Sequence, residues 1–76
     1  MKGWQYEKTP KLYDLLVNNK DSAYSISELC KEFKVRPEIM TAYTGYMREQ
    51  GLVTRKVFGS ELYVMATPLL VREWKK

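Results

Sequence analysis

The residues that most enzymes use for catalysis are scarce in this sequence. Its 76 residues include no histidine, and Cys30 is the single cysteine. A catalytic cysteine needs an adjacent base, and there is no histidine to activate Cys30. The sequence also lacks a glycine-rich phosphate loop. We therefore expect no enzymatic activity, no metal site and no cofactor, with Cys30 as an inert, buried core residue.

Small side chains offer contact chemistry instead. If residues 36–50 form a helix, one side of it carries Thr41, Ala42, Gly45 and Arg48. The opposite side carries the residues that would face a core: Met40, Tyr43 and Met47. Glycine inside a helix costs roughly 1 kcal/mol relative to alanine. Gly45 is thus either a tolerated surface glycine or the low point of a face that another surface approaches closely, and a nucleic-acid groove and a partner protein suit that face equally.

Three helices are predicted ahead of the strands. The first two begin at Thr9 and Ser27, which we expect to be their N-caps, and the third runs over residues 36–50. Residues 24–26 are expected to form a short extended piece. Gly51 is well placed to end the third helix in a left-handed conformation.

The hydrophobic period changes to that of a strand after the third helix. Residues 53–67 alternate between apolar and polar, break once, and alternate again. This pattern predicts a β-hairpin with Gly59 and Ser60 at its tip. Thr67 is then expected to cap a short final helix over residues 68–75.

This order of elements resembles the winged helix-turn-helix superfamily. The resemblance rests on the stretches "SISELCKEFKV", "IMTAYTGYM" and "REQGLVTRKVFGSELYVMAT", and it covers about residues 9–67. It implies an α+β fold: a small winged helix-turn-helix with a three-helix core, a two-stranded β-wing and a short C-terminal helix, forming a single domain over residues 1–76. The small, single-domain layout is similar to that of phage or mobile-element regulators.

The resemblance implies a sequence-specific DNA-binding protein that acts as a transcriptional regulator. Helix 36–50 would enter the major groove, and the wing at 53–67 would lie on the DNA backbone or in the minor groove. The residues expected to contact DNA are Lys34, Arg36, Thr41, Ala42, Gly45, Tyr46, Arg48, Arg55, Lys56 and Ser60. Among them, Arg48 can pair with guanine or hold a phosphate, whereas Arg55 and Lys56 are expected on phosphates.

A second binding function stays open. Glu38 and Glu49 share the outward side of helix 36–50, where carboxylates would be repelled by DNA phosphates. Residues 21–51 carry four basic and five acidic groups, so the net charge of +4 resides at the two ends of the chain. The alternative is a winged-helix module for protein–protein interaction that binds its partner through Thr41, Ala42 and Gly45.

The remaining expectations concern partners and location. The N- and C-terminal segments each contain a tryptophan, Trp4 and Trp74, and either complete the monomer core or form a homodimer interface. No apolar run approaches the roughly 20 residues of a membrane span, and the N-terminus does not read as a signal peptide. We expect no membrane partner, no small-molecule ligand and a cytoplasmic location.

Overall fold

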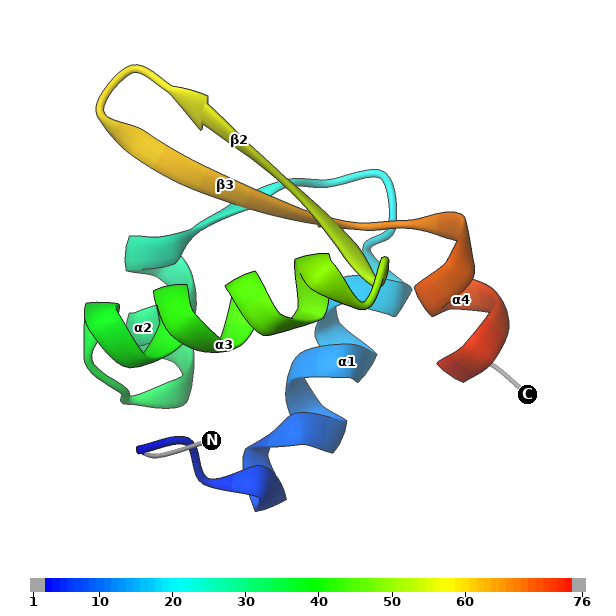
Figure 1. The fold of residues 1–76 in the computed structure, drawn as a ribbon, viewed down its shortest axis with the longest axis horizontal. Coiled ribbons are helices and arrows are strands. Elements are labelled where there is room, and N and C mark those ends of the chain that lie inside the picture. Colours follow the sequence, from blue (N-terminus) through cyan, green and yellow to red (C-terminus); the bar gives the residue numbers. More distant parts are fainter. Residues whose placement is uncertain (1–2, 75–76) are drawn as a thin grey trace.

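The computed structural model describes residues 3–74. Three helices precede a β-hairpin and a short final helix, as the sequence predicts (Figure 1). The elements are the 3-10 turn η1 (Tyr6–Lys8), α1 (Thr9–Asn18), β1 (Tyr24–Ser25), α2 (Ile26–Phe33), α3 (Pro37–Glu49), β2 (Val53–Phe58), β3 (Glu61–Ala66) and α4 (Pro68–Trp74). The final helix was expected to reach residue 75, which lies outside the described residues.

The strands form one antiparallel sheet in the order β1-β3-β2. In the hairpin, Val53 pairs with Ala66 and Phe58 pairs with Glu61, so the turn falls at the predicted place. Gly59 adopts the positive φ of 65° that this turn requires. The extended piece expected at residues 24–26 is the strand β1, which covers only Tyr24–Ser25 because Ile26 already begins α2. It pairs with the central strand β3 and ties the start of α2 to the wing.

The N-cap of α2 differs from the expected one. Ser25, not Ser27, caps the helix: its hydroxyl accepts a hydrogen bond from the backbone N–H of Glu28 at 3.1 Å, and the Glu28 carboxylate accepts one from the Ser25 N–H at 2.9 Å. This reciprocal pair is a capping box, which needs the serine three residues before the acid. Ser27 lies inside the helix and donates to the carboxylate of Glu61 on β3.

The expected cap at Thr9 is also wrong, because η1 runs directly into α1 and places Thr9 inside the helix. The hydroxyl of Thr9 accepts a hydrogen bond from the indole N–H of Trp4 at 3.0 Å. At the other end of the chain, the predicted cap is confirmed: the backbone N–H of Leu70 donates to the hydroxyl of Thr67 at 3.3 Å.

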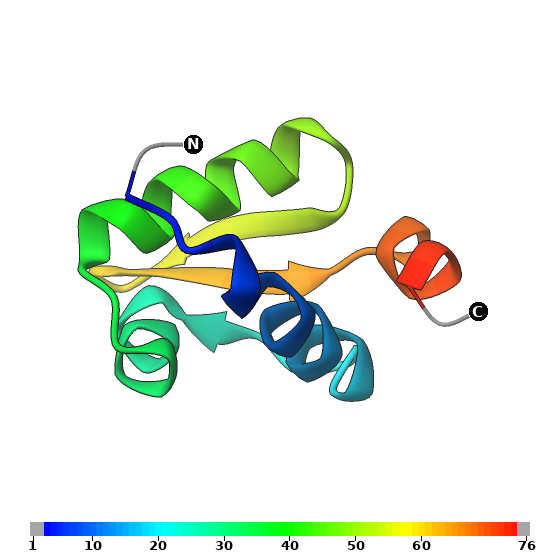
Figure 2. The ribbon, with the colours of Figure 1, turned by 90° about the horizontal axis from the view of Figure 1, so that it is seen from below.

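The core gathers around Tyr43 of α3. The N-terminal segment crosses from the start of α1 toward α3 (Figure 2), and the indole of Trp4 stacks on the Tyr43 ring with 4.0 Å between the ring centroids. The Tyr43 hydroxyl shares hydrogen bonds with Thr9 at 3.2 Å and Tyr13 at 3.4 Å. Trp4 is only 5% exposed, so it completes the core of the monomer. The buried apolar residues are Trp4, Leu12, Leu16, Val17, Ile26, Leu29, Phe33, Met40, Tyr43, Met47, Val53, Val64 and Leu70.

The two tryptophans give a matched test of this core. Trp4→Ala should lower the free energy of unfolding by about 3–5 kcal/mol, because it removes a buried ring and leaves a cavity beside Tyr43. Trp74→Ala should cost clearly less, because Trp74 is 37% exposed. Urea denaturation followed by far-ultraviolet circular dichroism measures both changes. A loss in Trp4→Ala as small as that expected for an exposed residue would show that Trp4 does not complete the core.

Candidate functional site

The helix α3 starts and ends where local sequence signals require. Its N-cap is Arg36, and Pro37 occupies the first helical position, where the missing N–H costs nothing. The φ of Gly51 is 77°, and the N–H of Leu52 then donates to the carbonyl of Met47 at 2.9 Å. Gly51 thus ends the helix in the left-handed conformation, as predicted, and leads directly into β2.

The two faces of α3 divide as the helical period predicts. Met40, Tyr43 and Met47 are buried, and Thr44, which the prediction did not place, is buried with them. The Thr44 hydroxyl is satisfied within the helix, because it donates to the carbonyl of Met40 at 2.9 Å. The exposed residues of α3 include Glu38, Thr41, Ala42, Tyr46, Arg48 and Glu49.

A side chain of the wing already approaches Gly45. The guanidinium of Arg55, on β2, lies against the glycine: a Cβ built on Gly45 would be 3.5 Å from Nη2 and 3.6 Å from Nη1 of Arg55. Nη1 also donates a hydrogen bond to the carbonyl of Thr41 at 3.1 Å. The close approach that Gly45 indicated therefore involves a residue of the same chain.

The space at Gly45 admits a methyl group beside the Arg55 guanidinium. Contacts of 3.5–3.7 Å to the Arg55 guanidinium are ordinary van der Waals distances, so alanine fits without moving Arg55. A side chain that extends from this Cβ toward the wing would meet the guanidinium next. Gly45 therefore keeps open a place on α3 for Arg55.

The basic residues of the wing point to different sides of the sheet. Successive strand residues face opposite ways, so Arg55 faces α3 whereas Lys56 lies on the outer face. There Lys56 borders a shallow, largely apolar groove of about 590 Å³. At the wing tip, Phe58 makes an edge contact with the Tyr63 ring yet stays 75% exposed, and Ser60 is exposed in the turn. Arg55 and Lys56 are adjacent in sequence but do not form one cationic patch.

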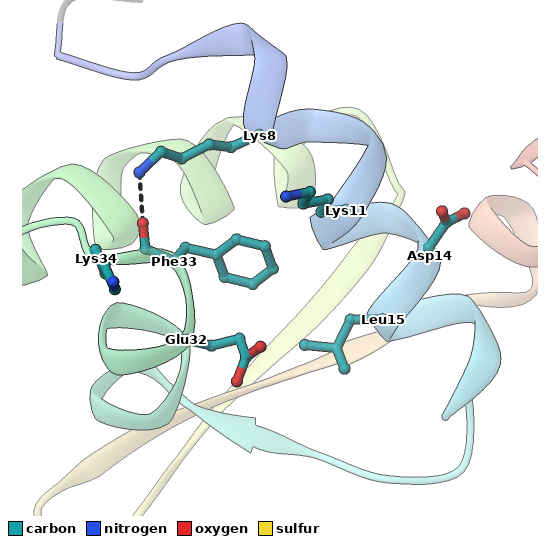
Figure 3. Close-up of a pocket in the computed structure, with 7 residues that line it drawn as sticks. All are labelled: Lys8, Lys11, Asp14, Leu15, Glu32, Phe33 and Lys34. Carbon is teal, nitrogen blue, oxygen red and sulfur yellow. Dashed lines mark hydrogen bonds between the residues drawn. The ribbon is translucent and has the colours of Figure 1, made fainter.

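The turn between α2 and α3 carries the other predicted cations. Lys34 adopts a left-handed conformation with a φ of 56° as the C-cap of α2, and both Lys34 and Arg36 are exposed. Lys34 borders an open groove of about 550 Å³ between α1 and α2 (Figure 3). Lys8 reaches across this groove and donates to the backbone carbonyl of Phe33. Because Asp14 and Glu32 also line it, the groove has mixed charge.

The thiol of Cys30 is half-buried in α2. Burial, together with the negative charge of Glu38, raises the pKa of the Cys30 thiol and disfavours the nucleophilic thiolate. Within residues 3–74, histidine, cysteine and acidic side chains form no group of three that could hold a metal ion. In the same residues, no helix is long and apolar enough to cross a membrane.

Comparisons with known proteins show likeness at the level of structure. No family model matches the chain, and no curated protein matches it in sequence. Among solved structures, the heme sensor protein PefR, in complex with heme and carbon monoxide, is 14% identical with a TM-score of 0.77, over 88% of this chain and 48% of PefR. The transcriptional regulator HlyU from Vibrio vulnificus CMCP6 is 18% identical with a TM-score of 0.67, over 86% of this chain and 69% of HlyU.

HlyU from Vibrio cholerae N16961, in its reduced form, is also similar. It is 14% identical with a TM-score of 0.70, over 92% of this chain and 74% of that protein. The chain thus spans about half the length of PefR and most of the length of HlyU. At these identities the likeness shows the fold, which is the winged helix-turn-helix implied by the sequence.

Two glycines of the α3 region give a test of the geometry at Gly45. Gly45→Ala should raise the free energy of unfolding by about 0.5–1 kcal/mol, because the methyl fits and alanine favours the helix. Gly51→Ala should lower it by about 1–2 kcal/mol, because the φ of 77° is strained for any residue with a Cβ. Thermal and urea unfolding report both. A destabilising Gly45→Ala would mean that Arg55 lies closer to the helix than the structure has it.

Proposed function

We propose that this winged helix-turn-helix chain binds double-stranded DNA in a sequence-specific manner and acts as a transcriptional regulator. The observation that carries the proposal is the outward face of α3. The core contacts lie on one side of this helix, and the other side presents small side chains and Arg48 to solvent. HlyU from Vibrio vulnificus, which shares the fold, is described as a transcriptional regulator.

In this proposal α3 enters the major groove of DNA. Thr41 and Ala42 are short enough to let the helix backbone sit close to the base edges, where each can contact a thymine methyl group. Arg48 follows on the same exposed face and can pair with the O6 and N7 acceptors of guanine. The Tyr46 hydroxyl, at the flank of the helix, is placed to reach a phosphate.

In this proposal, phosphate contacts come from the residues just before α3 and from the wing. Lys34 and Arg36 precede α3 and are exposed, as are Lys56 and Ser60 on the wing. Such contacts position the protein on the duplex and make affinity depend on salt. The exposed Glu38 and Glu49 oppose this attraction, so the cations before α3 and on the wing must outweigh them.

The dependence on salt tests the proposal directly. The logarithm of the binding constant for duplex DNA should fall linearly with the logarithm of salt concentration, with a slope of several units, because each neutralised phosphate releases counterions. Fluorescence anisotropy with a labelled mixed-sequence duplex measures it. Absence of binding at about 50 mM salt would exclude the DNA function.

Single substitutions separate base contacts from phosphate contacts. Arg48→Ala should relax the preference for one base pair, a loss of about 1–3 kcal/mol of discrimination. Lys56→Ala should weaken binding about equally on all sequences and reduce the salt slope by about one unit. Lys20→Ala, which removes an exposed charge of the α1–β1 loop, is the matched control. If Lys20→Ala weakens binding as much as Lys56→Ala, the wing is not part of the interface.

A homodimer extends the same proposal. Two copies related by two-fold symmetry would place two α3 helices about 34–36 Å apart, or a multiple of that, and the target would be palindromic. Because Trp4 is buried in the monomer, the C-terminal part of the chain, including Trp74, is the better candidate for this interface. Light scattering at the concentration of the DNA measurements gives the oligomeric state.

A protein partner on the same face is the second candidate function. Two exposed acids on α3, Glu38 and Glu49, favour it, because they are unfavourable beside phosphates but suit a basic protein surface. In that function the exposed Thr41 and Ala42 allow close approach of the partner, whereas Gly45, which the sequence also offered for this contact, is covered by Arg55. A face that serves this role would bind no DNA at low salt.

A further inference from the structure

The recognition helix of this chain carries few cations of its own. Arg48 is the one basic residue among the exposed residues of α3, against two acids. Yet the structure places a second guanidinium on the same helix, because Arg55 reaches over from β2 and lies on Gly45. At about 100° per residue, Gly45 and Arg48 lie one turn apart on the same side of α3. Both guanidinium groups therefore border the outward face.

The Arg55 side chain is held in this position from both ends. Its backbone pairs with Val64 in the hairpin, and one amino group, Nη1, donates to the Thr41 carbonyl at 3.1 Å. Its Nε is buried and lacks a hydrogen-bond partner among the described residues. A flexible surface arginine would instead keep its Nε in water, so the side chain is positioned by the fold.

The Arg55 guanidinium has more N–H donors than its hydrogen bond to Thr41 uses. Arginine carries five N–H donors in a rigid fork, and one of those of Arg55 donates to the Thr41 carbonyl. The Nη2 group, 3.5 Å from a Cβ built on Gly45, carries two further N–H groups on this side of α3. A preorganised fork beside the helix face matches the paired acceptors on the guanine edge in the major groove.

We infer that Arg55, although it belongs to the wing, reads DNA sequence as part of the α3 face, and that Gly45 is the positioning residue that makes room for it. This inference rests on the proposed DNA-binding function. It replaces the phosphate contact that the sequence predicts for Arg55 with a contact to a base edge. A cation from the wing thus adds to the DNA-contacting face of α3, which has only Arg48 of its own.

Two arginine variants distinguish base reading from phosphate contact. Selection from a randomised duplex library, followed by affinity measurement on the selected site and its single-base variants, should show that Arg55→Ala loses about tenfold or more of the preference at one base pair. Arg55→Lys should fail to restore this preference, because lysine keeps the charge but lacks the fork. Lys56→Ala, the adjacent wing cation, should leave the preference unchanged.

Two glycine variants test the positioning role. Gly45→Ala should keep the wild-type preference, because the methyl fits beside the guanidinium. Gly45→Leu should lose the same base preference as Arg55→Ala, because its side chain takes the place of the guanidinium. The double variant Gly45→Leu with Arg55→Ala should lose no more than either single variant, since both act through one group. Circular dichroism of each variant confirms that it is folded.

The outcomes distinguish a failure of base reading by Arg55 from a failure of the DNA-binding function. An unchanged preference in Arg55→Ala, or its restoration in Arg55→Lys, would overturn the inference while leaving the DNA-binding function intact. Additive losses in the double variant would likewise overturn it, since Gly45→Leu would then act through its own contact with DNA. Absence of wild-type DNA binding at low salt would instead overturn the proposed function, and this inference with it.

Discussion

The burial of Tyr43 is the constraint on which the orientation of α3 depends. Trp4 covers one face of its ring, and its hydroxyl reaches Thr9 and Tyr13 in α1. Burial and the hydrogen bond to Tyr43 raise the pKa of the Tyr13 hydroxyl, so Tyr13 stays protonated and keeps its donor. Rotating α3 about its axis would break these contacts together. The inner side of the helix thereby decides which residues face outward.

The wing is attached to α3 firmly enough to share its surface. The N–H of Leu52 bonds to the last turn of the helix, and the Thr67 hydroxyl donates to the Gly51 carbonyl at 2.7 Å, which closes the base of the hairpin. Val53 is buried directly after this junction. The strand that follows is therefore fixed relative to the helix. From this strand, Arg55 donates a hydrogen bond to the Thr41 carbonyl. The outward face of α3 is consequently built from two elements.

The elements themselves could be predicted from local patterns, whereas several of their contacts could not. The change from a helical to an alternating period located the hairpin, and Gly51 and Gly59 marked its ends. The predicted caps at Thr9 and Ser27 are wrong because each helix begins earlier: η1 leads into α1 ahead of Thr9, and Ser25 caps α2. Thr9 instead accepts from Trp4, and Ser27 donates to Glu61, 34 residues away. The partner of Ser27 becomes visible only when distant segments meet, whereas the capping box of Ser25 and Glu28 is a local signal that the prediction missed.

The sequence by itself determined the order of helices and strands and the two faces of α3, because helical and strand periods are properties of neighbouring residues. The sequence also assigned each predicted DNA-contacting residue to the helix, to the turn before it or to the wing. Only the tertiary structure decided what lies over Gly45. The helix pattern shows that a gap exists there, but it cannot show that a hairpin folds back and fills the gap with Arg55. That contact depends on the angle between wing and helix, at a junction where Val53 and Met47 are both buried in the core.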